Sequence, residues 1–203
     1  MKVIRLETNP KLYSGNSYLL LGSWNKIDDV NTLIDTGSDD YILKSIAKNN
    51  TGVGKRAVDQ VIITHSHFDH VGAVKALKEK YNAKILSFSY FPGVDRLVKN
   101  GELIKAGDDY LEIFHTPGHS YDSICIYNKK DEFLFSGDTT IFANDLDATY
   151  TQDYIDSMEK MMELELDIIY PGHGEPINNY SIKMAKSRHA DYLQSKKKKV
   201  SIK

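Results

Sequence analysis

Cysteine, tryptophan and proline are scarce in this chain of 203 residues, which has one cysteine, one tryptophan and five prolines. Since Cys125 has no second cysteine to pair with, an intramolecular disulfide is excluded, and we expect a reducing, cytoplasmic location. No apolar run approaches the roughly 18 residues of a membrane-spanning helix. The first residues also lack the apolar stretch of a secretory signal peptide. We therefore expect no membrane partner.

An excess of charge of either sign is also missing. Lys and Arg total 26 against 28 Asp and Glu, for a formal net charge of −2, so no broad basic field favours nucleic acid as a partner. The lysine run at residues 196–199 is interpreted as a solvated tail. The chain length fits one domain, predicted over residues 1–203, with room for a sizeable core. Composition leaves the oligomeric state open.

Extended apolar segments alternate with helical ones along the chain. Turn residues separate strands predicted near 2–7, 17–22, 30–35, 58–64, 84–88, 103–106, 110–115, 123–128, 132–136 and 167–170. Helical spacing of apolar residues and flanking polar segments predict helices near 39–48, 69–80, 152–164 and 179–196. Periodicity by itself indicates a mixed α/β protein.

Potential metal ligands are concentrated in residues 64–70, with the sequence THSHFDH. His65, His67, Asp69 and His70 follow the apolar segment 58–63, so a strand ending there would place all four side chains in the loop at its C-terminal end. Imidazole and carboxylate ligands suit Zn, Fe or Mn and need no cysteine. The run therefore predicts a metal site at this strand end.

Three later segments supply further ligands of the same type. His119, Asp138 and His173 each follow an extended apolar stretch and are flanked by glycine, which permits tight turns and close backbone approach. With the run at 64–70, the chain offers five histidines and two aspartates at predicted strand ends. Such a set is large enough for two metal ions that share one bridging carboxylate.

The H-x-H-x-D-H run and the three later motifs resemble those of the metallo-β-lactamase superfamily. This resemblance covers most of the chain and implies an α/β fold, a four-layer αββα sandwich. It also implies which residues would hold each ion: His65, His67 and His119 for the first, and Asp69, His70 and His173 for the second. Asp138 would bridge the two ions, and Asp69 and Asp138 would be catalytic.

Within that superfamily, the motifs look most like those of glyoxalase II. The similar segments are residues 64–73, 116–120 and 137–142. The resemblance implies hydrolysis of small acyl thioesters such as S-2-hydroxyacylglutathione. Longer members of that family hold glutathione with basic residues of a C-terminal helical domain. Here about one predicted helix follows His173, so glutathione recognition is not carried over to particular residues.

Two divalent metals, with Zn expected and Fe or Mn as alternatives, would lower the pKa of a bound water toward about 7 and polarise a carbonyl. The sequence has no G-x-S-x-G segment that would indicate a serine nucleophile instead. The predicted function is a dinuclear metal-dependent hydrolase acting on a small molecule. Three alternatives stay open: a mononuclear-iron persulfide dioxygenase, a lactonase, and a non-catalytic ligand-binding protein.

Aromatic residues near the predicted ligand loops are candidates for a substrate wall. They are Phe68, Tyr121, Phe142 and Tyr150. Cys125 lies in an alternating strand-like run and is predicted to be a small buried residue. His115 precedes His119 by four residues, but on a strand and turn it is expected to pack rather than to share the site of His119. His189 lies in a polar helical segment and is predicted to be a surface residue.

Overall fold

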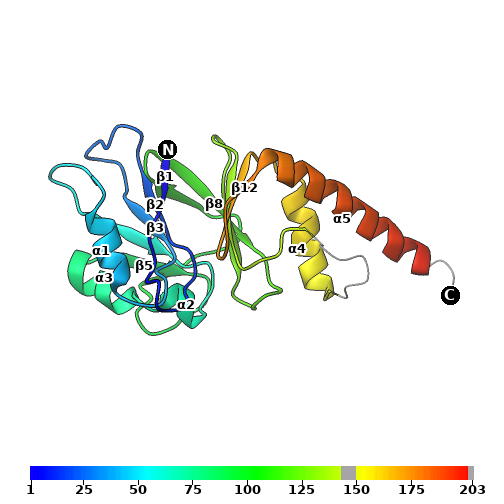
Figure 1. Ribbon diagram of the computed structural model, residues 1–203, viewed down its shortest axis with the longest axis horizontal. Helices are drawn as coiled ribbons and strands as arrows, with labels where there is room; N and C mark the ends of the chain where they lie inside the picture. Colours follow the sequence, from blue (N-terminus) through cyan, green and yellow to red (C-terminus); the bar gives the residue numbers. More distant parts are fainter. Residues whose placement is uncertain (143–149, 201–203) are drawn as a thin grey trace.

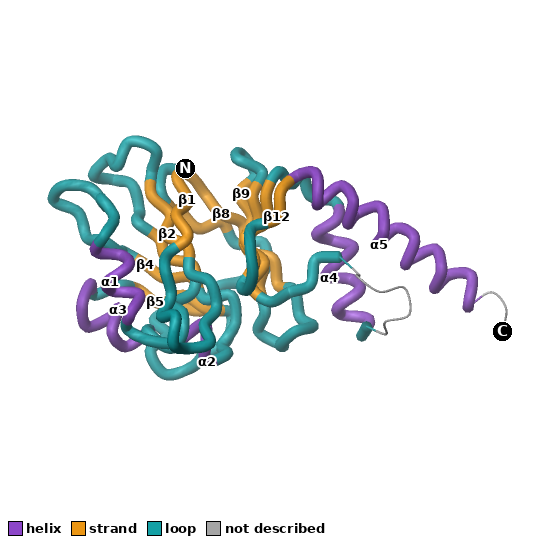
Figure 2. The backbone as a smooth tube through the Cα atoms, viewed as in Figure 1, coloured by secondary structure: helices purple, strands orange, loops and turns teal. Residues whose placement is uncertain are grey.

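Two six-stranded sheets face each other in the computed structural model, with helices on both outer faces (Figure 1). The structure describes the backbone of residues 1–142 and 150–200, and side chains through residue 192 outside that gap. Figure 2 shows the two sheets side by side in the middle of the molecule, between the two groups of helices.

The first sheet contains the strands of the N-terminal half, in sequence order. These are β1 (Lys2–Arg5), β2 (Tyr18–Leu21), β3 (Thr32–Ile34), β4 (Gln60–Ile62), β5 (Lys84–Ser87) and β6 (Arg96–Leu97). The first three strands are antiparallel, and β3 to β6 are parallel. Helix α1 (Tyr41–Ala47) follows β3, and helix α3 (Val74–Tyr81) precedes β5.

The second sheet also follows sequence order. Its strands are β7 (Leu103–Ala106), β8 (Asp109–His115), β9 (Ile124–Asn128), β10 (Phe133–Gly137), β11 (Ile168–Pro171) and β12 (Ile177–Asn178). Its one parallel pair, β10 and β11, is connected through helix α4 (Gln152–Met162). Helix α5 (Asn179–Val200) follows β12 and extends away from the sheets (Figure 1).

Apolar side chains fill the three interfaces between these four layers. Leu19, Leu33, Ile46, Leu77 and Ile85 lie between the first sheet and its helices. Leu20, Ile34, Ile62, Ile113 and Phe135 lie between the two sheets. Leu134, Met161, Leu166, Ile169 and Ile182 lie between the second sheet and α4 and α5. Consecutive strand residues such as Leu19 and Leu20 point to opposite faces, as strand geometry requires. The four-layer αββα prediction is confirmed.

One predicted helix is divided, and two strands were not predicted. The segment 69–80 forms α2 (Phe68–Val71) and α3, with a break at Gly72. A Cβ at Gly72 would lie 2.1 Å from the carbonyl oxygen of Ser38, so close backbone packing from the loop before α1 explains the glycine there. The strands β6 and β12 contain two residues each, too few for a visible alternating pattern.

The prediction that His189 is a surface residue was wrong. His189 lies on α5 with no exposed area, and its ring is 6.0 Å from that of Tyr192. Tyr192 in turn packs against Met158 of α4, so one side of α5 is buried by the neighbouring helix. The many charged residues around His189 concealed that buried side. The side chains of the lysine run at 196–199 lie outside the described residues.

In the part of the chain that the structure describes, every helix is too short or too polar to cross a bilayer.

Candidate metal centre

The seven predicted ligands lie together at one edge of the two sheets, in loops that follow strand ends. His65 and His67 follow β4, and α2 carries Asp69 and His70. The other three follow strands of the second sheet: His119 after β8, Asp138 directly after β10, and His173 after β11. Because both sheets end at this edge, residues more than 100 positions apart meet there.

Three imidazole rings form the first group. The Nδ1 atom of His67 lies 3.1 Å from Nε2 of His65 and 3.0 Å from Nε2 of His119. His65 is buried, whereas His67 and His119 are exposed. Three ring nitrogens directed at one another present lone pairs to one point, which is the arrangement that a divalent cation needs.

Two imidazoles and a carboxylate form the second group. The Nε2 atom of His173 lies 3.1 Å from Oδ2 of Asp69, and Nε2 of His70 lies 3.7 Å from the same oxygen. Asp69 and His70 are buried, and His173 is partly exposed. This group therefore has nitrogen and oxygen donors, with one side open to solvent.

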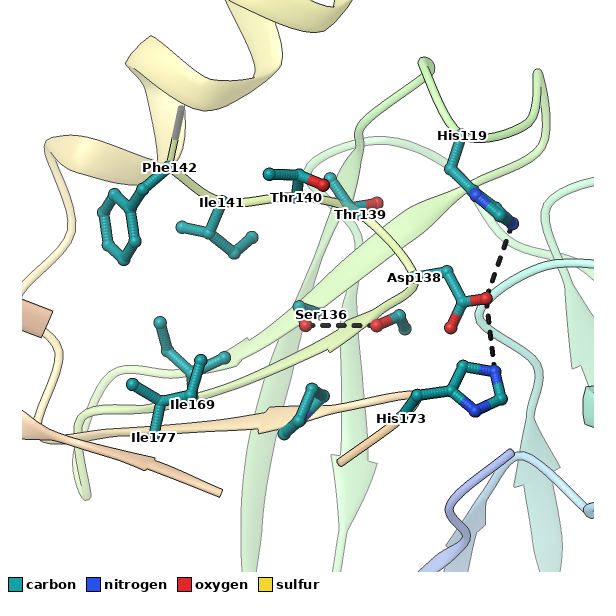
Figure 3. Close-up of a pocket in the computed structure, with 12 residues that line it drawn as sticks. His119, Ser136, Asp138, Thr139, Thr140, Ile141, Phe142, Ile169, His173 and Ile177 are labelled. Carbon is teal, nitrogen blue, oxygen red and sulfur yellow. Dashed lines mark hydrogen bonds and ion pairs between the residues drawn. The ribbon is translucent and has the colours of Figure 1, made fainter. Parts of the chain in front are cut away.

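Asp138 lies between the two groups, and Figure 3 shows its carboxylate between the rings of His119 and His173. Its Oδ2 is 3.5 Å from Nε2 of each of those rings, and its Oδ1 is 3.4 Å from Nε2 of His70. A Cβ at Gly172 would lie 2.2 Å from Oδ1. The glycine before His173 thus leaves the space that the carboxylate occupies.

The donor atoms fit a pair of divalent ions. Nε2 of His70 and Oδ1 of Asp138 are buried without a hydrogen-bond partner, an arrangement that is costly unless a ligand binds there. The donor atoms within each of the two groups lie within 4.8 Å of one another. Nitrogen and carboxylate oxygen are suitable ligands for Zn, Fe and Mn.

Asp35 contacts the potential ligand His70 and the backbone before His65, and the sequence analysis did not select it. Its Oδ2 is 2.8 Å from Nδ1 of His70 and accepts a hydrogen bond of 2.7 Å from Oγ1 of Thr64. Its Oδ1 accepts another of 2.7 Å from the backbone N–H of Thr64. Asp35 is buried, with φ at 54°, in the left-handed region. A signal existed, because Asp35 follows the apolar strand β3 just as Asp138 follows β10.

Asp122 connects the two ligand loops and was also missed. Its Oδ2 accepts a hydrogen bond of 3.0 Å from the backbone N–H of Ser66, which lies between His65 and His67. Its Oδ1 accepts one of 2.7 Å from Oγ of Ser120, the residue after His119. Asp122 therefore fixes the spacing of the first group.

The charges at the centre act strongly on one another. Burial lowers the pKa of His70, but the carboxylates of Asp35 and Asp138 outweigh it and raise that pKa to about 10. Burial raises the pKa of Asp138, but His70 and the neighbouring histidines outweigh it and lower that pKa to about 2. Burial, followed by the charge on His70, lowers the pKa of His65 to about 4. These pKa shifts are those expected when the ionised carboxylate of Asp138 is surrounded by closely packed imidazole rings.

The four predicted substrate-wall residues occupy different environments. Phe68 and Tyr121 are exposed, Phe142 is almost fully buried in the core beside the second sheet, and Tyr150 packs against Tyr154 and Tyr192. Their contact with substrate stays a prediction.

Tyr13, which the sequence analysis did not select, lies against one of the potential ligands. Its ring stacks on that of His173 at 5.0 Å, and its hydroxyl is 3.3 Å from Nε2 of His173.

Two predictions about residues outside the centre are confirmed. Cys125 is fully buried, and burial raises the pKa of its thiol to about 11. His115 stacks on Phe88 with ring centroids 3.9 Å apart, and its Nε2 lies 2.7 Å from the carbonyl oxygen of Tyr121. His115 therefore packs beside the ligand loops instead of pointing into them.

Comparison with known proteins shows which family this chain resembles. Residues 10–89 and 84–173 match the metallo-beta-lactamase superfamily. A hydroxyacylglutathione hydrolase of Pelagibacter ubique is 29% identical over 199 residues, covering 95% of this chain and 80% of that protein. An atrochrysone carboxyl ACP thioesterase of Aspergillus fumigatus is 27% identical over 210 residues, covering 99% of this chain and 64% of that protein.

Solved structures share the fold at lower identity. ETHE1 from Myxococcus xanthus has a TM-score of 0.72 and 23% identity, with 94% of this chain and 85% of that chain covered. The B3 metallo-β-lactamase BLEG-1 has a TM-score of 0.68 and 23% identity, with 89% and 95% covered. The family match extends over most of the sequence and includes all seven clustered residues. The chain belongs to the metallo-β-lactamase superfamily, whose members bind divalent metals.

Proposed function

We propose that this protein is a dinuclear metal-dependent hydrolase of small acyl thioesters. The observation that supports two ions best is the position of Asp138, whose two oxygens face different groups of potential ligands. His65, His67 and His119 would hold one ion, and Asp69, His70 and His173 the other. Zn is the expected metal, and Fe or Mn would fit the same donors.

Two ions bound there would supply a hydroxide nucleophile at neutral pH and polarise the substrate carbonyl. Asp69, whose Oδ2 lies 3.1 Å from Nε2 of His173, would help to hold the second ion and to orient the attacking water. Asp138 would fix the separation of the two groups. Asp35 would keep the imidazole of His70 in one orientation through its Nδ1 atom.

A thioester substrate fits this centre for two reasons. A thiol has an ordinary pKa of about 8.5, so a thiolate leaves without a strong general acid. The names of two relatives, a hydroxyacylglutathione hydrolase and a carboxyl ACP thioesterase, point to the same bond. S-2-hydroxyacylglutathione is therefore one candidate substrate. We place the reaction in the cytoplasm, because the single cysteine is a buried free thiol.

The test is metal analysis combined with turnover on one metal-loaded preparation. We expect close to two ions per chain, lost together with activity on chelation. We also expect kcat/KM for S-lactoylglutathione or a simpler thioester to exceed that for an acyl-homoserine lactone, a β-lactam and a phosphodiester. A lactone or phosphodiester ahead of both thioesters by about tenfold, roughly 1.4 kcal/mol, would overturn the substrate assignment. One iron per chain with oxygen uptake would indicate a persulfide dioxygenase instead.

A further inference from the structure

A cavity of about 460 Å³ begins at the metal centre and continues away from it. His119, Asp138 and His173 line one end. Ile141, Phe142, Ile169 and Ile177 line the other, and Figure 3 shows these four on the side away from the two histidines. Ser136, Thr139 and Thr140 also line the cavity, and Figure 3 shows the two threonines between Asp138 and Ile141. The lining thus changes from potential metal ligands through hydroxyl groups to apolar side chains.

The walls of this cavity are fixed by the second sheet and α4. Ile169 is a fully buried residue of β11, and Ile177 belongs to the edge strand β12. The hydroxyl of Tyr154 on α4 accepts a hydrogen bond of 2.8 Å from the backbone N–H of Thr140. That bond holds the start of the loop that carries Ile141 and Phe142, so the apolar end is built from anchored residues.

Charged groups on the cavity wall are confined to the polar end. Among the described lining residues none is Lys or Arg, and the ionisable ones are His119, Asp138 and His173. An anionic group in the apolar end would lose its hydration without meeting a cationic side chain among the described lining residues, which is unfavourable. An alkyl chain would lose only unfavourable apolar hydration. The apolar end therefore favours a hydrocarbon ligand.

We propose that the apolar end, lined by Ile141, Phe142, Ile169 and Ile177, binds an alkyl chain on the acyl side of the substrate. A thioester has two arms, and common thiol carriers such as glutathione are polar and charged. With the carbonyl beside Asp138, the acyl arm enters the cavity and the carrier arm points toward solvent. The substrate class is then an acyl thioester with an apolar chain, recognised by that chain more than by its thiol.

This assignment rests on the proposed thioester hydrolysis. Two measurements distinguish a failure of the acyl-chain assignment from a failure of the proposed function. The first compares kcat/KM for acetyl, butyryl, hexanoyl and octanoyl thioesters on one carrier, using the metal-loaded protein. We expect kcat/KM to rise about fourfold for each added methylene until the cavity is filled. The same acyl group on coenzyme A or on glutathione should give values within about threefold of each other. Equal rates for every chain length would overturn the acyl assignment and leave the hydrolase function intact.

The second measurement is binding of the corresponding alkyl carboxylates by calorimetry, which needs no turnover. We expect octanoate to bind more tightly than acetate, with a more negative heat-capacity change because apolar surface is buried. Tighter binding of octanoate without hydrolysis of any thioester would support the cavity assignment and overturn the proposed function. Equal affinity for octanoate and acetate would overturn the cavity assignment.

A substitution in the cavity tests whether the preference for long acyl chains arises there. Ile177→Phe adds volume at the half-buried edge of the cavity and should lower the octanoyl-to-acetyl ratio of kcat/KM by about tenfold. Ile27→Phe, at an exposed position outside the cavity, is the matched control and should leave that ratio unchanged. Metal content and the urea midpoint of both variants report whether the fold is kept. An unchanged ratio in a folded Ile177→Phe variant would overturn the assignment.

Discussion

Asp35 and His70 form a buried pair, with 2.8 Å between Oδ2 of Asp35 and Nδ1 of His70. Asp35 also accepts two hydrogen bonds from Thr64, the residue before the first histidine of the ligand run. Fixing one ring nitrogen leaves the other, Nε2, facing the centre without a protein hydrogen-bond partner. The carboxylate therefore sets both the orientation and the basicity of the donor that faces a metal.

Replacing Asp35 by asparagine tests that relationship. Asn keeps the shape and tolerates the positive φ of 54°, but it removes the charge next to His70. We expect metal affinity to fall by about 10- to 100-fold, measured by competition with a chelator. Asp28→Asn, at an exposed aspartate, is the matched control. Wild-type affinity in a folded Asp35→Asn variant would contradict a role for the charge of Asp35 in metal binding.

The two carboxylates of the centre should differ in importance. Asp138→Ala removes a carboxylate that, among the described residues, is the one beside both groups of potential ligands. Asp69→Ala removes a carboxylate of the second group. We expect Asp138→Ala to lose more bound metal and more activity than Asp69→Ala. The measurement is metal content after dialysis, followed by kcat with saturating metal. Equal metal content in wild type and Asp138→Ala would refute the bridging position.

The absence of a side chain at Gly172 should be as important for metal binding as the ligands beside it. A Cβ there would lie 2.2 Å from Oδ1 of Asp138 and 2.9 Å from both Cε1 of His70 and the backbone of Gly137, so Gly172→Ala requires atoms of the site to shift. We expect reduced metal content in that variant, measured after dialysis. Gly101→Ala is the control, because it meets no atom within 4 Å and adds only the strain of a positive φ. It should lose some stability and keep its metal.

Stability of the chelated protein should depend on pH through His70. Its pKa in the folded protein is raised to about 10, from an ordinary value of 6.5. The folded state therefore binds an extra proton between those values. The resulting stabilisation is complete below about pH 6.5 and is lost as the pH rises toward 10. We expect the urea midpoint to fall over this range.

The metal-loaded protein is the control for that pH dependence. A metal ligand must be a neutral imidazole, so His70 would already lack the proton on Nε2 while keeping the one on Nδ1 that faces Asp35. The midpoint should therefore vary less between pH 7 and 10. Apparent metal affinity should increase over the same range, because binding releases the proton of His70. Parallel pH profiles for the chelated and loaded forms would show that His70 is not a ligand.

Local sequence was sufficient to predict most elements of the fold and the members of the clustered site. The ten predicted strands are present, because buried strands of both sheets have apolar runs bounded by turn residues. The broken helix at Gly72 and the burial of His189 were not predictable in the same way. The close packing of Gly72 against Ser38 and the burial of His189 on the side of α5 that faces α4 both involve neighbours elsewhere in the chain.

The sequence by itself determined which side chains offer donor atoms, because His and Asp at strand ends are visible in short motifs such as residues 64–70. The tertiary structure placed Asp138 between the two groups, as the family resemblance implied, and it alone decided that Asp35 supports His70. It also placed Ile141, Ile169 and Ile177 around one cavity. The physical reason is that donor type is a local property of a residue. Distances between donors, and the walls of a cavity, depend on how the two sheets and their outer helices pack.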